Sequence, residues 1–315
     1  MASFKFKKIY LDKYSTISSL NEKIYSKFTI EDLHLGEKTS EEAEEKMQDI
    51  IFNDLAKDEK IDFVIGGDLS NELCTISKTF EGKEVPLLGI YSACATFCEG
   101  LIIASSIIHE TNFKKGVIMV SSHNLNAEKT YKYPVEYGVV KKHTQTFTLT
   151  AAAGVVITKK ETNIKLESAT IGKIIDSNIT DVSNMGAVMA PAAFTTLIDH
   201  LNDLKRDIDY YDLIITGDLG LLGTKLFYKL LEENDITSNN HIDAGAMIIK
   251  DKKLSKQGGS GPVCLPLFLF DEILENKKYK KILLIATGSL HNKTLTNQKR
   301  TIPSIAHAVS LEVLS

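Results

Sequence analysis

Two kinds of segment alternate along the chain: short apolar runs, and longer stretches in which apolar residues recur at helical spacing. The short runs end in turn residues and predict buried strands, whereas the longer stretches predict helices. Strands are expected over 63–65, 85–91, 116–120, 155–158, 213–215, 246–249, 282–286 and 308–313, and helices over 95–110, 190–203, 219–233 and 265–276. This alternation predicts an α/β fold with largely parallel sheets.

The first 60 residues are more polar and predict one helix. Residues 40–56 read SEEAEEKMQDIIFNDLA, with Ser40 as the expected N-cap and acidic residues in the first turn. Met47, Ile50, Ile51 and Leu55 recur at helical spacing and define its apolar face.

Three pairs of segments resemble each other in the same order along the chain. IDFVIGGDL (61–69) and YDLIITGDL (211–219) are identical at five of nine positions, so Asp68 and Asp218 are expected at equivalent strand ends. The other pairs are 114–122 with 280–288 and 148–156 with 301–309. Collinear pairs indicate an internal duplication. We expect two βα halves, about 1–160 and 161–315, and an inserted loop at about 124–147.

Composition and charge narrow the functional classes. The 315 residues are 43% hydrophobic and 25% charged, and 37 Lys and Arg against 41 Asp and Glu give a net charge of −4. A nucleic-acid-binding protein is expected to carry a basic surplus, so no nucleic-acid partner is predicted. The length fits two domains or one large one.

Membrane and redox features point to a soluble protein of a reducing compartment. The longest apolar stretch, 101–108, is far shorter than the ~20 residues of a spanning helix, and the N-terminus lacks the apolar core of a secretory signal. Four cysteines in a chain of this length do not form a disulfide framework. A cytoplasmic location is therefore expected.

The sharpest candidate for chemistry is Cys94, in the turn Ser92-Ala93-Cys94-Ala95-Thr96 between an expected strand and an expected helix. A thiol at a helix N-terminus faces unpaired N–H groups, which favour a thiolate nucleophile or an anion bound beside it. The alternative is a small buried core cysteine. Cys98, one turn later, lacks the surrounding ligands of a metal site.

Other small and polar residues follow strand ends that are expected to meet near Cys94, because open α/β sheets bind ligands beyond the carboxyl ends of their strands. The turn Gly258–Gly261 could supply backbone N–H groups to an anion or be a plain surface turn. His123 and His291 could orient a ligand or be structural, and Asp68 and Asp218 could cap turns. The pocket wall is predicted to contain Ser122, His123, Asp218, Ser260 and Thr287, with Cys94 at its floor.

Several motifs resemble those of the thiolase superfamily and, more closely, the stage V sporulation protein AD family of spore-forming Firmicutes. The resemblance runs from about residue 60 to the end. Its motifs are GGDLSNE (66–72), SACAT (92–96), SSHN (121–124), YPVEYG (133–138), MAPAA (189–193), YDLIITGDLG (211–220), GGSG (258–261), ATGSL (286–290) and IPSIAHAVSLE (302–312).

This resemblance implies a thiolase-like five-layer αβαβα fold built from two duplicated βα halves. It implies binding of dipicolinic acid during its uptake into the developing spore, with membrane proteins of the uptake complex as partners and a peripheral place at the spore inner membrane. A homodimer is expected, and no cofactor, although Ca²⁺ could accompany dipicolinate. Lys129 and Lys132 of the inserted loop, together with Lys141 and Lys142, are expected to offer cations to the dianion.

Departures from the enzymes of the superfamily predict that catalysis is absent. Those enzymes place a histidine after the strand that here continues into Gly217-Asp218, and a second His or Asn near GGSG, and this chain has neither. Losing positioned acid–base and oxyanion groups costs on the order of 10² to 10⁴ in rate each. Two alternatives stay open: an acyltransferase or condensing enzyme that uses Cys94 with His123 or His291 as base, and a structural partner with a dead pocket.

Overall fold

Ten strands of the described residues form one continuous hydrogen-bonded path, and β6 and β12 form a separate pair. The computed structural model describes residues 2–20, 26–131, 142–249 and 253–314. The path runs β11-β10-β13-β14-β8-β1-β7-β5-β3-β4. In chain order its strands are β1 (Ser3–Ser19), β3 (Phe63–Gly67), β4 (Leu87–Gly89), β5 (Lys115–Ser122), β7 (Ala151–Thr158), β8 (Ile164–Thr170), β10 (Leu213–Thr216), β11 (His241–Asp243), β13 (Lys281–Ser289) and β14 (Pro303–Val313).

The path has the same sequence of pairings on both sides of the β1–β8 pair. From β1 outward, β7 and β5 pair antiparallel, and β3 and β4 then add in parallel. From β8 outward, β14 and β13 pair antiparallel, and β10 and β11 add in parallel. Asp68 and Asp218 follow β3 and β10, so their predicted equivalence is confirmed. The boundary at about residue 160 as a domain boundary stays a prediction.

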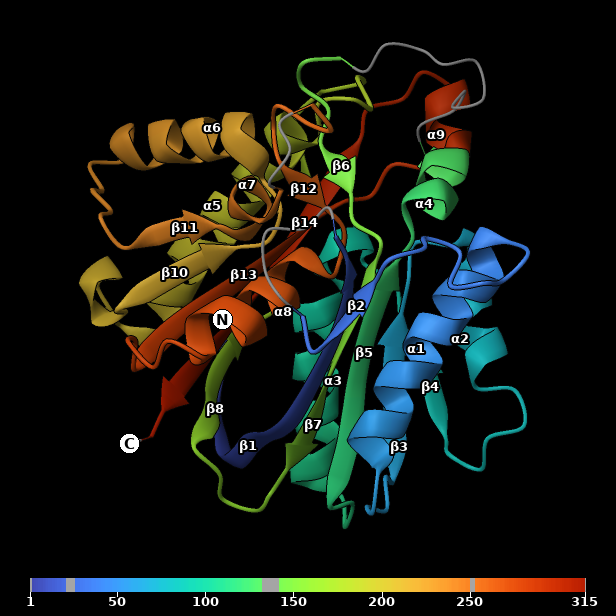
Figure 1. Ribbon diagram of the computed structural model, residues 1–315. Coiled ribbons are helices and arrows are strands. Elements are labelled where there is room, and N and C mark those ends of the chain that lie inside the picture. The colour runs from blue at the N-terminus through green and yellow to red at the C-terminus, as the bar shows by residue number, and fades with distance from the viewer. Residues whose placement is uncertain (1, 21–25, 132–141, 250–252, 315) are drawn as a thin grey trace.

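Helices form three layers around the strands (Figure 1). The helices are α1 (Ser40–Ala56), α2 (Cys74–Thr79), α3 (Thr96–Glu110), α4 (Asn124–Tyr131), α5 (Met185–Leu204), α6 (Gly220–Glu232), α7 (Ala244–Ile248), α8 (Cys264–Phe268, continued as a π-helix over Leu269–Leu274) and α9 (Lys293–Asn297). One core cluster joins α1 and α2 to β3, β5 and β7, and another joins α5 and α6 to β10, β13 and β14. The largest cluster holds α3 and α8 between the two sets of strands.

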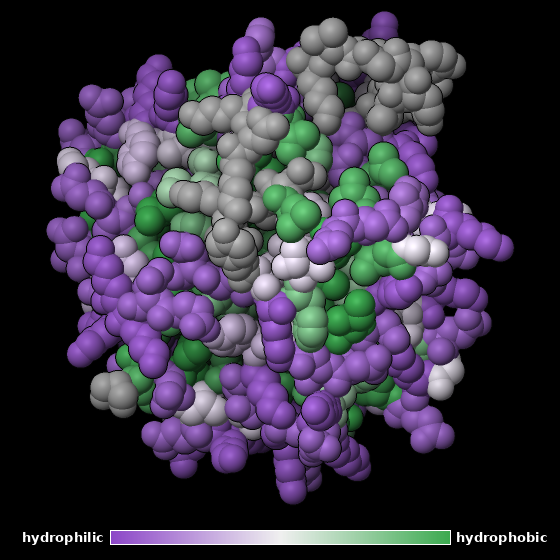
Figure 2. All heavy atoms as spheres, viewed as in Figure 1, coloured by the Kyte–Doolittle hydropathy of each residue, from purple (hydrophilic) through white to green (hydrophobic). Residues whose placement is uncertain are grey.

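The layers are therefore helix, sheet, helix, sheet, helix, which is the predicted five-layer αβαβα architecture. Helix α3 is apolar on nearly every side because sheets cover two of its faces. Phe97, Leu101 and Ile108 on it are fully buried, and each such side chain contributes roughly 1.5–3 kcal/mol. By length and composition alone, the segment Ala93–Glu110 could also cross a membrane. Its burial identifies it as a core helix. Hydrophilic side chains cover most of the face in Figure 2.

Several sequence-based expectations need correction. The N-cap of α1 is Thr39 rather than Ser40, because Glu42 is three residues after Thr39 and closes a capping box with it. Residues 246–248 of the strand expected at 246–249 belong instead to helix α7, which Asp243 caps by accepting a hydrogen bond from the Ala246 backbone N–H at 2.8 Å. The inserted loop carries α4 and the short strand β6 (Phe147–Thr148).

Central strand β1 escaped detection because its alternation is interrupted. The register shifts between Leu11 and Tyr14 against β7 and between Lys5 and Ile9 against β8, and Lys8 has a φ of 54°. β-Bulges of this kind move side chains out of the strict two-residue period by which strands are recognised.

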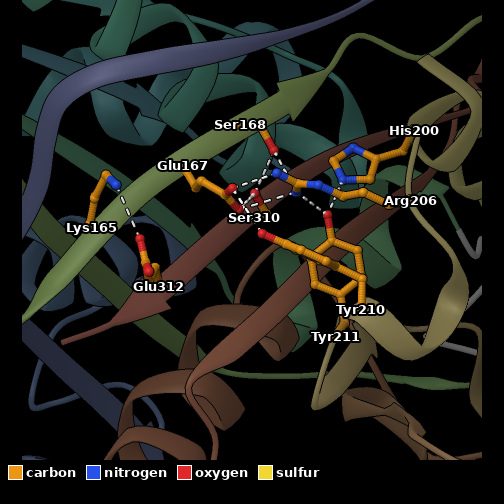
Figure 3. Close-up of polar contacts among 9 residues, drawn as sticks. All are labelled: Lys165, Glu167, Ser168, His200, Arg206, Tyr210, Tyr211, Ser310 and Glu312. Carbon is orange, nitrogen blue, oxygen red and sulfur yellow. Dashed lines mark hydrogen bonds and ion pairs between the residues drawn. The ribbon is translucent and has the colours of Figure 1, made fainter. Parts of the chain in front are cut away.

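A buried ion-pair network fixes the outer helix of the second half to the sheet (Figure 3). Arg206, whose side chain is 6% exposed, pairs with Glu167 of β8 and donates to the Tyr211 hydroxyl at 2.7 Å. Burial raises the pKa of Glu167, but the hydrogen bond and charge of Arg206 more than offset it and hold that pKa below its usual range. His200 bonds the same Tyr211 hydroxyl, and Ser310 of β14 donates to Glu167.

Two glycines let strand ends approach the turn that holds Cys94. A Cβ on Gly288 of β13 would lie 2.3 Å from the carbonyl oxygen of Ser92, and one on Gly67 of β3 would lie 2.4 Å from that of Ile90. Gly288 and Gly67 belong to the two halves of the fold, so both halves meet at this turn.

We predict that Gly288→Ala lowers the free energy of unfolding by about 1–3 kcal/mol, because backbone must move to admit the methyl group. Gly217→Ala, at the end of neighbouring β10, is the matched control. Its Cβ would meet its nearest atom at 3.5 Å, so a neutral effect is expected. Urea unfolding of both variants measures this, and equal destabilisation would contradict it.

Candidate functional site: a closed pocket at Cys94

Cys94 lies in a strained turn at the start of the central helix. The turn is a single 3₁₀ turn over Ala93–Ala95 that runs directly into α3. Ala93 has a φ of 51°, which is uncommon for a residue other than glycine. Thr96 secures the turn: its Oγ1 accepts from the Ser92 backbone N–H at 3.0 Å and donates to the Ala93 carbonyl at 2.7 Å. The thiol is thereby placed at the helix N-terminus, as predicted.

Asp218 is the hydrogen-bonding centre of the site. Its carboxyl accepts from the Gly261 backbone N–H at 3.1 Å and the Thr287 hydroxyl at 3.0 Å, and it also bonds the Cys94 thiol. Complete burial raises the pKa of Asp218 to about 7, against the partial compensation of these donors. One carboxyl thus joins the end of β10, the glycine turn, the end of β13 and the start of α3.

The glycine turn is shaped for this contact. Gly259 and Ser260 form strand β12, which pairs in parallel with β6, and Gly258 and Gly261 have φ values of 111° and 120°. A side chain at Gly261 would approach the Ser122 hydroxyl oxygen to 2.9 Å. Only glycine permits this conformation with the Gly261 N–H directed at Asp218.

A cavity of about 20 Å³ lies against Cys94. Its lining consists of Leu69, Tyr91, Ala93, Cys94, Tyr131, Thr148, Met185, Ser260, Ser289 and His291. The volume is enough for about one water molecule. It is far below what a pyridine ring with two carboxylates occupies, so the pocket is closed in this conformation.

Three aromatic side chains close the cavity. The hydroxyl groups of Tyr91 and Tyr131 are hydrogen-bonded at 2.7 Å. The ring of Tyr131 meets the ring of His291 edge-on, with centroids 5.1 Å apart. The Ser289 hydroxyl bonds Nδ1 of His291 at 3.1 Å and orients that imidazole.

Of the predicted pocket residues, only Cys94 and Ser260 line the cavity. Asp218 and Thr287 do not line it but belong to the hydrogen-bond network of the Cys94 thiol, and the other two predicted wall residues lie elsewhere. His123 is fully buried, with Nε2 on the Leu33 carbonyl at 2.9 Å and Nδ1 accepting from the Leu125 N–H. Burial lowers the pKa of His123. Ser122 donates to the Leu149 carbonyl at 2.8 Å. Neither lines the cavity, because their strand end is covered by the loops before α1 and after β6.

The predicted lysine contacts are also corrected. Nζ of Lys129 bonds the Ser40 hydroxyl at 2.9 Å and Glu41 at 3.3 Å, so this side chain reaches α1 rather than the cavity. Lys142 pairs with Asp181 at 3.1 Å. Lys132 and Lys141 lie outside the described residues. Within the described ranges, no group of three or more His, Cys, Asp or Glu side chains could hold a metal ion.

Sequence reasoning missed Tyr91 and Tyr131 as pocket residues. Tyr91 ends an expected strand and Tyr131 lies in a stretch expected to be a loop, so neither had a periodicity that placed its side chain. His291 was singled out only through its counterpart His123. The signal available was position: Tyr91 is three residues before Cys94.

Solved structures define the class of fold. The chain is similar to 3-oxoacyl-[acyl-carrier-protein] synthase III from Aquifex aeolicus, at a TM-score of 0.58 and 13% identity over 96% of this chain and 99% of that one. It is similar to a variant of OleA from Xanthomonas campestris, at a TM-score of 0.64 and 13% identity over 98% of both chains. The protein therefore has a thiolase-like fold.

Sequence comparison identifies the family within that class. Residues 19–312 match the stage V sporulation protein AD family. The chain is 36% identical over 311 residues to stage V sporulation protein AD of Bacillus subtilis (strain 168), which covers 96% of this chain and 90% of that protein. The chain belongs to the stage V sporulation protein AD family, and is a sporulation protein.

The raised pKa of Asp218 predicts a specific pH dependence of stability. Folding raises that pKa from 3.8 to about 7, so stability present at acid pH is lost as the pH rises toward 7. The loss is up to ~1.4 kcal/mol per pH unit. Asp218→Asn cannot ionise, so its unfolding free energy is expected to fall less between pH 5 and pH 7 than that of the parent.

Chemical denaturation at several pH values measures the difference. The control is Asp209→Asn, an exposed carboxyl, whose curve is expected to parallel the parent. Parallel curves for Asp218→Asn and the parent would show that Asp218 is already ionised at pH 5.

Proposed function

We propose that this protein is a non-catalytic thiolase-fold protein that binds dipicolinic acid at the Cys94 pocket and assists its uptake into the developing spore. The observation that carries the non-catalytic part is the bond between Cys94 and Asp218. The thiol donates its proton in this hydrogen bond to a carboxyl oxygen, which keeps the proton on sulfur and disfavours the thiolate, and any ionised fraction of Asp218 disfavours it further. Thiolase-type chemistry requires that thiolate, a base and oxyanion donors.

The electrostatics of the site suit a planar anion. The pocket lies at the N-terminal end of α3, where backbone N–H groups and the helix dipole favour negative charge. Protonated Asp218 would add no repulsion. The aromatic walls formed by Tyr91, Tyr131 and His291 match the flat face of a pyridine ring. Entry of the ligand requires the cavity to open, because a volume of about 20 Å³ has room for only about one water molecule.

Membership of a sporulation family supports the spore as the place of action. We further propose membrane proteins of the dipicolinate uptake complex as partners and a peripheral position at the spore inner membrane. Ca²⁺ would arrive with the ligand rather than on a protein site. A homodimer is proposed through the open edge of β4, the last strand of the path, where Leu88 is 46% exposed.

An acyltransferase is the second candidate, because His291 lines the same cavity as Cys94. We predict that incubation with acetyl-CoA or malonyl-CoA leaves Cys94 unmodified, since the thiol bonds Asp218. Intact-mass and peptide mass spectrometry test this. A stoichiometric acyl group on Cys94 would establish the enzyme instead.

Dipicolinate binding is the decisive measurement for the binder. Calorimetric titration, with and without Ca²⁺, is expected to give saturable binding to the parent and a modest loss in Cys94→Ala. Cys94→Leu is expected to abolish binding, because the cavity has no room for the larger side chain, while overpacking costs ~1–3 kcal/mol of stability.

Thermal melting of both variants distinguishes lost binding from lost fold. A folded Cys94→Leu protein that binds like the parent would place the ligand elsewhere. A parent that does not bind dipicolinate would favour a structural partner with a dead pocket.

A further inference from the structure

Helix α4 is held firmly at its start and ends over the cavity. At its first turn, the Asn124 backbone N–H donates to the Thr150 hydroxyl and its side-chain amide donates to the Thr148 carbonyl, both at 3.0 Å. Asn126 donates to Glu44 of α1 at 2.7 Å. Tyr131 is the last residue of the helix, and its side chain lines the cavity wall.

The contact that closes the cavity is weaker than this anchorage. Tyr131 reaches Tyr91 through one hydroxyl–hydroxyl bond at an exposed position. The Tyr91 side chain is 41% exposed, so its hydroxyl can bond water when the bond to Tyr131 breaks. A neutral hydrogen bond of this kind shifts an equilibrium by roughly fivefold, which equals about 1 kcal/mol.

We propose that Tyr131 and Tyr91 form a gate on the Cys94 pocket. In the closed state the two hydroxyls bond and the cavity has room for about one water molecule. In the open state the side chain of Tyr131, at the end of α4, swings away from Tyr91, while Asn124, Asn126 and Lys129 keep the helix in place. The slot that opens leads to Cys94 between the rings of Tyr91, Tyr131 and His291, and it admits a planar aromatic carboxylate.

The gate rests on the closed geometry alone, and only the nature of the ligand rests on the proposed function. Alkylation of Cys94 by N-ethylmaleimide tests the gate without any ligand, because the reagent reaches the thiol only when the pocket is open. Cys74 is exposed, so the test uses a Cys74→Ser background. Cys98 and Cys264 are fully buried and report unfolding.

Tyr131→Phe removes the hydroxyl and keeps the ring. If the bond favours the closed state fivefold, the open fraction rises from about one sixth to about one half, so we expect Cys94 to be alkylated roughly threefold faster than in the parent. Tyr91→Phe is expected to match it, and Tyr131→Ala, which also removes the ring wall, to exceed both. The matched control is Tyr14→Phe. Its hydroxyl makes a 2.7 Å bond of equal length to Glu275, on an element remote from α4, and it is expected to leave the rate unchanged.

Peptide mass spectrometry follows Cys94 and Cys264 separately. Parent rates in Tyr131→Phe and Tyr91→Phe would overturn the gate. If Cys264 is alkylated as fast as Cys94 in Tyr131→Ala, that variant is unfolding. The test of the gate then rests on Tyr131→Phe and Tyr91→Phe.

A second arm adds dipicolinate. Slower alkylation of Cys94 in the parent background is expected. Fast alkylation in the gate variants without protection by dipicolinate would leave the gate standing and overturn the proposed ligand.

Discussion

The site depends on the close approach of β13 to the turn that begins α3. This approach joins the two halves of the chain, because β13 belongs to the second half and the turn to the first. This approach is possible because Gly288 has no Cβ atom, which would otherwise clash with the Ser92 carbonyl oxygen. Thr287, the preceding residue, then reaches Asp218, which in turn bonds Cys94. A small displacement of β13 would therefore separate the thiol from its carboxyl partner and change the cavity together with it.

The two halves use their equivalent aspartates differently. Asp68 accepts from the backbone N–H groups of Ser70 at 2.7 Å and Ile76 at 2.9 Å, so it stabilises the turn that leads into α2. Asp218 accepts from Gly261 and Thr287 across three separate elements and contacts the thiol. The two aspartates thus occupy equivalent backbone positions in the two halves, but their side chains have different hydrogen-bond partners. Turn stabilisation is a local task that any duplicated strand end can retain, whereas the contact to Cys94 exists only where the halves meet.

The sequence predicted what depends on local pattern and strand order. The α/β alternation, the turn at Cys94 and the convergence of Asp218, Ser260 and Thr287 follow from apolar runs and from the rule that strand ends meet at one edge. It could not predict which way side chains turn. His123 ends a strand near the site, yet its imidazole bonds Leu33, a residue 90 positions away. Lys129 has a charge suited to an anion but is held by α1. Residues 246–249 read as a strand, and Asp243 starts a helix there instead.

A gate whose closed state is favoured by about 1 kcal/mol controls access to the pocket but has only a small effect on the affinity for a ligand. The apparent dissociation constant of a ligand that binds only the open state rises by the inverse of the open fraction, which is roughly fivefold to sixfold for such a gate. That is a small cost against the contacts a dianion gains at the N-terminus of α3. The closed state meanwhile keeps bulk solvent from Cys94 and Asp218, so the carboxyl stays buried and its proton is retained up to about pH 7. Closure of the pocket and protonation of Asp218 therefore support each other. When the pocket opens, water hydrates Asp218 and lowers the free-energy cost of its negative charge. An ionised Asp218 makes the site less suited to an anion until the ligand displaces that water.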